Sequence, residues 1–64
     1  MGLAMSTFKV GEVVKGRVCG VFRVRGFRTV GSVEMLVLKE VHPDNHSVEA
    51  KGTLCLPLTS VVPL

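Results

Sequence analysis

The chain of 64 residues contains no tryptophan and no tyrosine, and its three phenylalanines are its only aromatic residues. Single-strand nucleic-acid binders normally offer more aromatic side chains for base stacking, so a broad stacking platform is disfavoured. Acidic residues are also scarce, with five Asp and Glu against eight Lys and Arg, which gives a formal net charge of +3. The glutamates stand singly along the sequence, so no carboxylate pair for acid–base catalysis is evident.

A long hydrophobic run is also missing. The longest uninterrupted aliphatic stretch is "MLVL" at residues 35–38, far short of the roughly 20 residues that span a bilayer. The opening residues, "MGLAMSTF", have neither the basic leader nor the apolar segment of a signal peptide. We therefore expect no membrane association and a cytoplasmic location.

Residues that bind metals or carry out catalysis are few and scattered. Cys19 and Cys55 each lie in an apolar run, so in a reducing compartment we expect two small buried side chains and no disulfide. His42 and His46 flank Asp44, but zinc sites need three or four supported ligands. Ser60 and the neighbouring threonine have no base nearby in the sequence. We expect no metal, no cofactor and no enzymatic activity.

Apolar residues, in contrast, are abundant. They make up 47% of the chain, and the mean hydropathy is +0.46. A domain of this length buries only about 60% of the surface that its unfolded chain exposes. Because large apolar patches are uncommon on monomers, we expect a homo-oligomer or a domain that docks on a protein partner.

The pattern of valines and glycines predicts an all-β fold. No window carries apolar residues at helical spacing for long enough to predict a helix. We expect residues 1–8 to form a flexible lead-in, and residues 9–64 to form one small β-barrel of about five strands. The expected strand segments are residues 12–18, 21–25, 27–30, 33–41, 47–51 and 53–56, of which 21–25 is either a second strand or the continuation of the first past Gly20.

Proline and polar residues mark the connections between these segments. The sequence "HPDNHS" at residues 42–47 predicts a hairpin with one of the longer loops. Gly52 predicts a bend or bulge that helps a small sheet to curl. Pro57 ends the last expected strand, and "LTS" after it predicts a short 3₁₀ turn.

Two known protein families contain short segments that are similar to segments of this sequence. "VGEVVKGRVCGVFRVRGF" resembles the start of the OB-fold RNA-binding domains that are repeated in a large ribosomal protein of the small subunit. The similarity rests on the residues at matching places: Gly11, Glu12, Val13, Val14, Gly16, Arg17, Val18 and Phe27. "VEMLVLKEVHPDN" resembles a later strand and turn of that family. This resemblance implies an OB-like barrel that binds RNA.

The second resemblance is to SH3-like barrels of the KOW and plasmid-encoded dihydrofolate reductase type. It rests on the opening pattern xVGxxV and on "LCLPLTSVV" at residues 54–62, which is similar to a strand, a proline, a 3₁₀ turn and a hydrophobic ending. The reductase's Val-Gln-Ile-Tyr active-site segment is absent, so its activity is not implied. We favour a small five-stranded SH3-like barrel, with an OB-like barrel as the alternative.

Nearly all of the excess positive charge lies in one stretch. Residues 15–28 contain five cations and no acid, whereas the rest of the chain has three lysines and five acids. In a strand, Arg23 and Arg25 share one face, and Arg17 joins them if no bulge intervenes at Gly20. The candidate residues for binding nucleic acid or a partner are Lys15, Arg17, Arg23, Arg25, Phe27 and Arg28.

Three functions remain open at this point. We favour a non-enzymatic interaction module that associates with itself or with a protein partner, using "MLVL" and "PLTSVVPL" as apolar contact surfaces. The alternative is an RNA- or DNA-binding module that uses the basic stretch, since arginine grips phosphate in bidentate fashion. The third is an oligomeric enzyme with a shared central site. Cross-strand pairing of the arginines with Glu34 or Glu49 would instead leave an idle solvated face.

Overall fold

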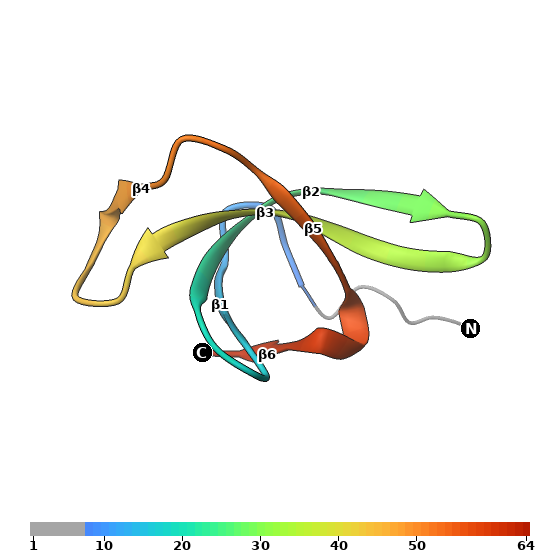
Figure 1. The fold of residues 1–64 in the computed structure, drawn as a ribbon, viewed down its shortest axis with the longest axis horizontal. Coiled ribbons are helices and arrows are strands. Elements are labelled where there is room, and N and C mark those ends of the chain that lie inside the picture. The colour runs from blue at the N-terminus through green and yellow to red at the C-terminus, as the bar shows by residue number, and fades with distance from the viewer. Residues whose placement is uncertain (1–7) are drawn as a thin grey trace.

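The fold is that of a computed structural model, in which the structure is described for residues 8–64 (Figure 1). It is all-β, as the sequence predicted, but it has six strands and not five. The additional strand lies in the C-terminal tail, whose residues pair with the first strand. The elements are β1 (Val13–Gly16), β2 (Val21–Val30), β3 (Val33–His42), β4 (Asn45–Glu49), β5 (Leu54–Pro57), the 3₁₀ helix η1 (Leu58–Ser60) and β6 (Val61–Pro63).

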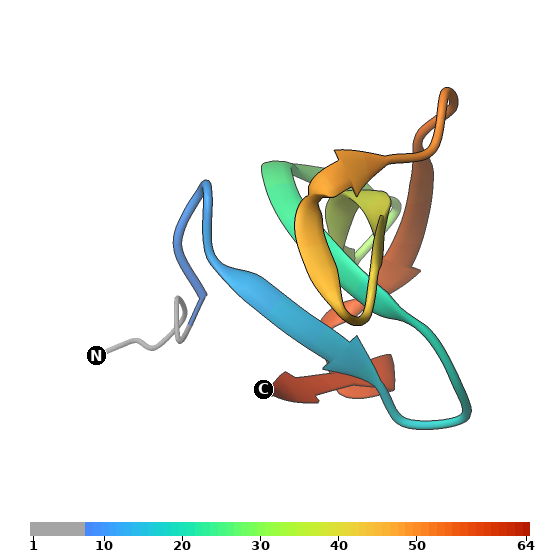
Figure 2. The same cartoon turned by 90° about the vertical axis from the view of Figure 1, so that its left-hand side faces the viewer.

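The strands form one antiparallel sheet with the order β4-β3-β2-β1-β6, and β5 pairs with residues 35–38 of β3 on the edge away from β2. In Figure 2, β6 lies beside the end of β1, close to the C-terminus. The predicted 3₁₀ turn is confirmed as η1, which connects β5 directly to β6. Within residues 8–64, β5 and β6 share no ladder of hydrogen bonds, so hydrogen bonding leaves the sheet open there.

β2 is a single strand of ten residues, whereas the sequence predicted two segments separated at Gly26. Its register against β3 shifts between Val24 and Gly26, so Arg25 is an extra residue in a β-bulge. A bulge lets a strand bend without ending. This is why the glycine did not break the strand.

The core contains side chains from both ends of the described chain. Phe22 and Val24 on β2 and Leu36 and Leu38 on β3 follow the alternation of a strand with one buried face. Phe8 is 6% exposed and so belongs to this core, although the sequence placed it in the lead-in. The other core residues are Val14 and Val61, with Leu56 and Leu58 packed against the cluster. Residues 1–7 of the expected lead-in lie outside the described residues.

The predicted hairpin at residues 42–47 is confirmed, with a shorter connection than expected. His42 pairs with Asn45, so only Pro43 and Asp44 lie between the strands. The Asp44 N–H donates to Nδ1 of His42 at 3.1 Å, and the Ser47 N–H donates to Oδ1 of Asn45 at 3.1 Å. These two local bonds give the backbone N–H groups of Asp44 and Ser47 an acceptor within the turn, as polar turn residues commonly do.

A second hairpin, between β2 and β3, extends away from the rest of the molecule at the right of Figure 1. Val30 and Val33 pair across a two-residue turn, in which Gly31 adopts a positive φ of 63°. A positive φ at the first central residue and a negative one at Ser32 define the II′ turn that suits tight hairpins. Every residue from 27 to 34 is exposed, and we call this segment the arm.

Two expectations about apolar residues are wrong. "MLVL" is not a contact surface, because Leu36 and Leu38 are fully buried. Cys19 is not buried, because it lies in the turn between β1 and β2, where Val18 is 96% exposed. Cys55 is half-buried, and both cysteines are free thiols.

Candidate functional site

Arg23 uses its guanidinium to hold other segments of the chain. Its Nε lies 3.2 Å from Oε2 of Glu49, its Nη1 donates to the Gly11 carbonyl at 3.1 Å, and its Nη2 donates to the His46 carbonyl at 3.0 Å. These bonds join β2 to the loop before β1 and to β4. The planar fork of arginine suits such multiple contacts. Arg23 therefore has a structural role in the fold.

Arg25 shares the same carboxylate but is held less closely. Its Nη1 is 3.8 Å from Oε1 of Glu49, and its side chain is 52% exposed. The structure thus brings Arg23 and Arg25 together, with Glu49 between them. An exposed pair at this distance contributes little to stability, so Arg25 keeps a cation available at the base of the arm.

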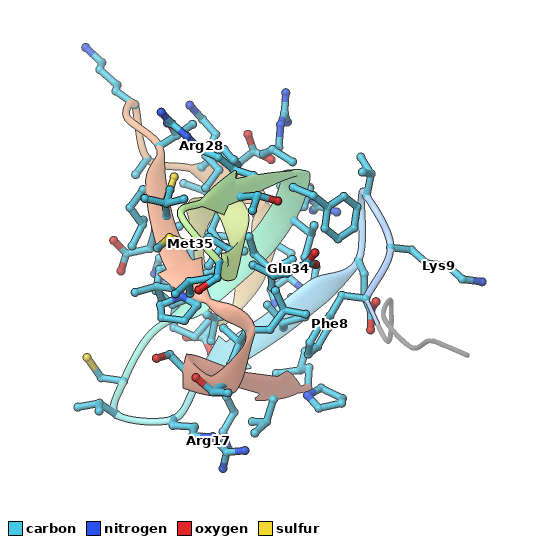
Figure 3. All side chains as sticks on the ribbon, turned by 90° about the vertical axis from the view of Figure 1, so that its right-hand side faces the viewer. Phe8, Lys9, Arg17, Arg28, Glu34 and Met35 are labelled. Carbon is cyan, nitrogen blue, oxygen red and sulfur yellow. The ribbon has the colours of Figure 1, made fainter. Side chains whose placement is uncertain are left out.

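The other predicted binding residues lie elsewhere. Arg17 is in the turn after β1, where its Nε donates to the Thr59 carbonyl at 2.7 Å. Lys15 is exposed on β1 between Val21 and Val62. Arg28 is in the arm, and Figure 3 shows Arg17 and Arg28 at opposite ends of the view. The residues of the predicted basic stretch are therefore divided among several parts of the surface.

The arm carries three of the five exposed large apolar side chains that lie on strands in residues 8–64. Phe27 is 50% exposed, Val30 51% and Val33 49%. Phe27 lies opposite Leu36, whereas Arg28 lies opposite Met35 and Val30 opposite Val33. Opposite residues of a pair share a face, so Phe27 occupies one face of the ribbon and the two valines the other. Both faces of the arm therefore expose apolar surface.

One backbone edge of the arm is also free. β1 pairs with residues 21–23 of β2, and Val24 exchanges hydrogen bonds with Gly11 and Glu12. Beyond this point, residues 26–30 pair with β3 alone among residues 8–64, and Arg25 is the extra residue of the bulge. An exposed strand edge is a template for pairing with another chain. This edge was not predicted from the sequence, although Gly31 and Ser32 between two valine-rich runs are typical of a hairpin turn.

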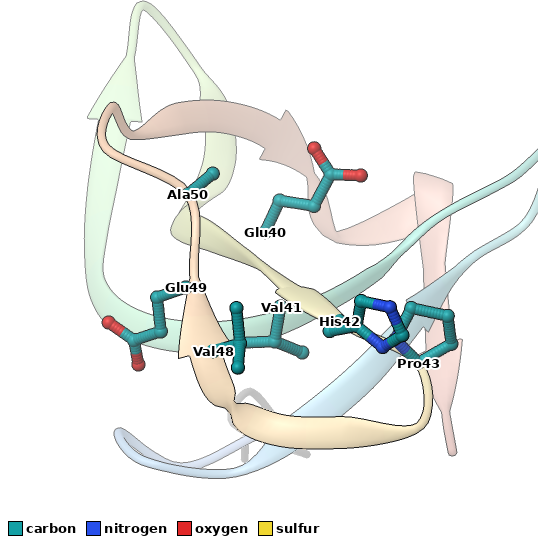
Figure 4. A pocket seen from close by; sticks show the side chains of 7 residues that line it. All are labelled: Glu40, Val41, His42, Pro43, Val48, Glu49 and Ala50. Carbon is teal, nitrogen blue, oxygen red and sulfur yellow. The ribbon is translucent and has the colours of Figure 1, made fainter.

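Two shallow hollows lie elsewhere on the surface. One, of about 280 Å³, is lined by seven residues around the turn from β3 to β4, which are Glu40, Val41, His42, Pro43, Val48, Glu49 and Ala50 (Figure 4). The other, of about 300 Å³, is apolar and lies by the turn from β1 to β2. Within the described part of the chain, no group of three or more His, Cys, Asp or Glu is placed to hold a metal ion.

Comparisons of the chain with protein-family models, with curated proteins and with solved structures found no match. Among residues 8–64, no helix is long and apolar enough to cross a membrane.

Proposed function

We propose that this chain is a non-enzymatic protein-interaction module, built on an SH3-like barrel and binding its partner through the arm. The order of the last elements supports the SH3-like proposal. β5 ends in Pro57, η1 follows at once, and β6 returns to pair with β1. The order of strand, proline and 3₁₀ turn is the ending on which part of the resemblance to SH3-like barrels rests.

The observation that carries the functional proposal is the solvent exposure of the arm. A two-stranded ribbon without a covering layer is marginally stable in water. This ribbon nevertheless presents Phe27, Val30 and Val33, each about half exposed. An apolar side chain at such a place is explained if another protein surface covers it. The partner is either a second copy of the chain or a different protein.

An NMR experiment on the ¹⁵N-labelled protein tests this proposal. Three additions are compared: unlabelled protein at rising concentration, a set of synthetic extended peptides, and a short single-stranded RNA. We expect the protein or the peptides to shift the amide signals of residues 25–35. The proposal fails if neither does so, or if their shifts cluster around the hollow of Figure 4 instead of the arm.

A nucleic-acid module is the second candidate, because half-exposed Phe27 is next to Arg28 in the arm. Such a pair could stack on a base and contact its phosphate. The geometry gives this candidate less support than the sequence did, because the donors of Arg23 are engaged by Glu49 and by two carbonyls. RNA binding that weakens steeply with salt and shifts the amide signals of the arm would favour it.

A further inference from the structure

The register of the β2–β3 hairpin determines which backbone groups point to the free edge. Val30 and Val33 flank a two-residue turn, and the pair in that position is hydrogen-bonded. Because hydrogen-bonded and non-hydrogen-bonded pairs alternate along an antiparallel ladder, the pairs of Arg28 with Met35 and of Gly26 with Val37 are hydrogen-bonded too. The N–H and C=O groups of Phe27 and Thr29 therefore point away from β3, to the free edge.

The charges along this edge are of one sign. Arg28 forms no ion pair within residues 8–64, and Arg25 has only its 3.8 Å contact with Glu49. The one acid of the arm, Glu34, lies opposite Thr29, on the ribbon face that does not carry Arg28. The free edge thus combines unpaired backbone groups with two cations: Arg28, which has no ion-pair partner among residues 8–64, and Arg25, which is held by Glu49 only at 3.8 Å.

We propose that the free edge of β2, residues 25–30, binds an extended acidic segment of a partner protein, which adds to the sheet as a further strand. This inference rests on the proposed function and names the chemistry of the partner. Strand addition supplies main-chain hydrogen bonds, while the alternating side chains supply specificity. The added strand alternates acidic residues, which lie beside Arg28, with apolar residues, which lie beside Phe27.

A second copy of the chain fits this edge less well. In an antiparallel pair centred on Arg28, the two Arg28 side chains would face each other, and like charges directly opposite are destabilising. If the two copies instead pair with their Phe27 residues opposite each other, Arg25 and Arg28 of one copy lie within a few residues of Arg25 and Arg28 of the other, along the shared edge. Charged residues on an edge strand commonly prevent such self-pairing. An acidic segment turns the same charges into attraction.

A labelled peptide that alternates valine and glutamate over about eight residues, enough for one ordinary strand, is the probe. We expect fluorescence anisotropy to show binding that weakens with added salt, and the ¹⁵N-labelled protein to show the largest shifts at residues 25–30. Two matched peptides serve as controls: one with lysine for glutamate, and one with alternate backbone nitrogens methylated. Neither should bind, because the first reverses the charge and the second removes the hydrogen-bond donors.

Three variants test the site on the protein. Arg28→Glu should weaken binding about tenfold, because an attraction becomes a repulsion of similar size. Lys15→Glu makes the same charge change away from the arm and should leave the affinity within about twofold at moderate salt. Thr29→Pro removes an N–H at the free edge while leaving the ladder with β3 intact, and should abolish binding while the signals of the core residues stay in place.

The outcomes separate this inference from the proposed function. The acidic-strand inference is overturned if the lysine peptide binds as tightly as the glutamate peptide. It is also overturned if Arg28→Glu and Lys15→Glu weaken the binding of the glutamate peptide equally. If no peptide binds but rising protein concentration shifts the arm, a second copy is the partner; the inference then fails and the proposed function stands. If neither peptide nor protein shifts the arm, both fail.

Discussion

The inner and outer halves of β2 and β3 differ in how far their side chains are buried. Val24 and Leu38, in the inner halves of these strands, are fully buried, whereas Val30 and Val33, in the outer halves, are about half exposed. The residue types are alike and the same ladder joins both regions. The difference lies in what else is near: β1 pairs with the inner half of β2, and β5 pairs with residues 35–38 of β3.

This comparison shows that the hydrophobicity of a segment does not decide its burial. In the inner region, apolar side chains pack against strands that are distant in sequence. In the arm, side chains of the same kind have no such cover among residues 8–64. Stability should therefore be concentrated in the inner region, and changes in the arm should affect binding more than folding. Four predictions test this division.

The largest effect is expected from Leu38→Ala. Leu38 is fully buried, and removing a buried leucine side chain costs about 3 kcal/mol of unfolding free energy. In a domain of this size that loss is comparable to the whole stability. The matched control is Leu64→Ala, since Leu64 is 64% exposed and should change stability by less than about 0.5 kcal/mol. Urea denaturation followed by circular dichroism measures both, and equal losses would contradict the division.

A smaller loss of unfolding free energy, about 2 kcal/mol, is expected from Arg23→Ala. The change removes the contacts of Arg23 with Glu49, Gly11 and His46, and hydrogen bonds that involve a charged group contribute more than neutral ones. Arg28→Ala removes a cation of the same type from the arm and should leave the denaturation midpoint almost unchanged. If the two variants lose the same stability, Arg23 does not hold the inner region together.

Two glycines give the next comparison. Gly20 has a φ of 94°, and a Cβ atom there would lie 2.7 Å from Cζ of Phe22, so Gly20→Ala should cost about 1–2 kcal/mol. A Cβ at Gly26, at the base of the arm, meets nothing within 4 Å, and Gly26→Ala should lie within about 0.5 kcal/mol of the wild type. Thermal denaturation of both variants measures the difference. A larger loss at Gly26 would show that the bulge needs the glycine.

The smallest effect on stability is expected in the arm itself. Replacing Val30 and Val33 together by threonine keeps the β-branched shape and adds two hydroxyl groups that water can reach. The unfolding free energy should change by less than about 0.5 kcal/mol, whereas binding through the arm should weaken. A cost above about 2 kcal/mol would show that the valines are buried against the molecule itself in solution.

Local patterns allowed much of the fold to be predicted. The alternation of apolar residues around Val24 and Leu38, the hairpin at Pro43 and Asp44, and the 3₁₀ turn after Pro57 each depend on a few neighbouring residues. The strand β6 was missed because its pairing with β1 joins residues that are far apart in the sequence. The bulge at Arg25 was missed for a similar reason, since a change of register is defined only against the partner strand.

The sequence by itself determined that the chain forms strands, that residues 42–47 connect two of them in a hairpin and that its positive charge is concentrated in residues 15–28. Only the tertiary structure decided which cations are engaged: Glu49 holds Arg23 and Thr59 holds Arg17, while Arg28 stays open. It also decided which apolar side chains are covered. Strand propensity and charge are properties of nearby residues, whereas burial and pairing depend on contacts that form only when distant strands meet.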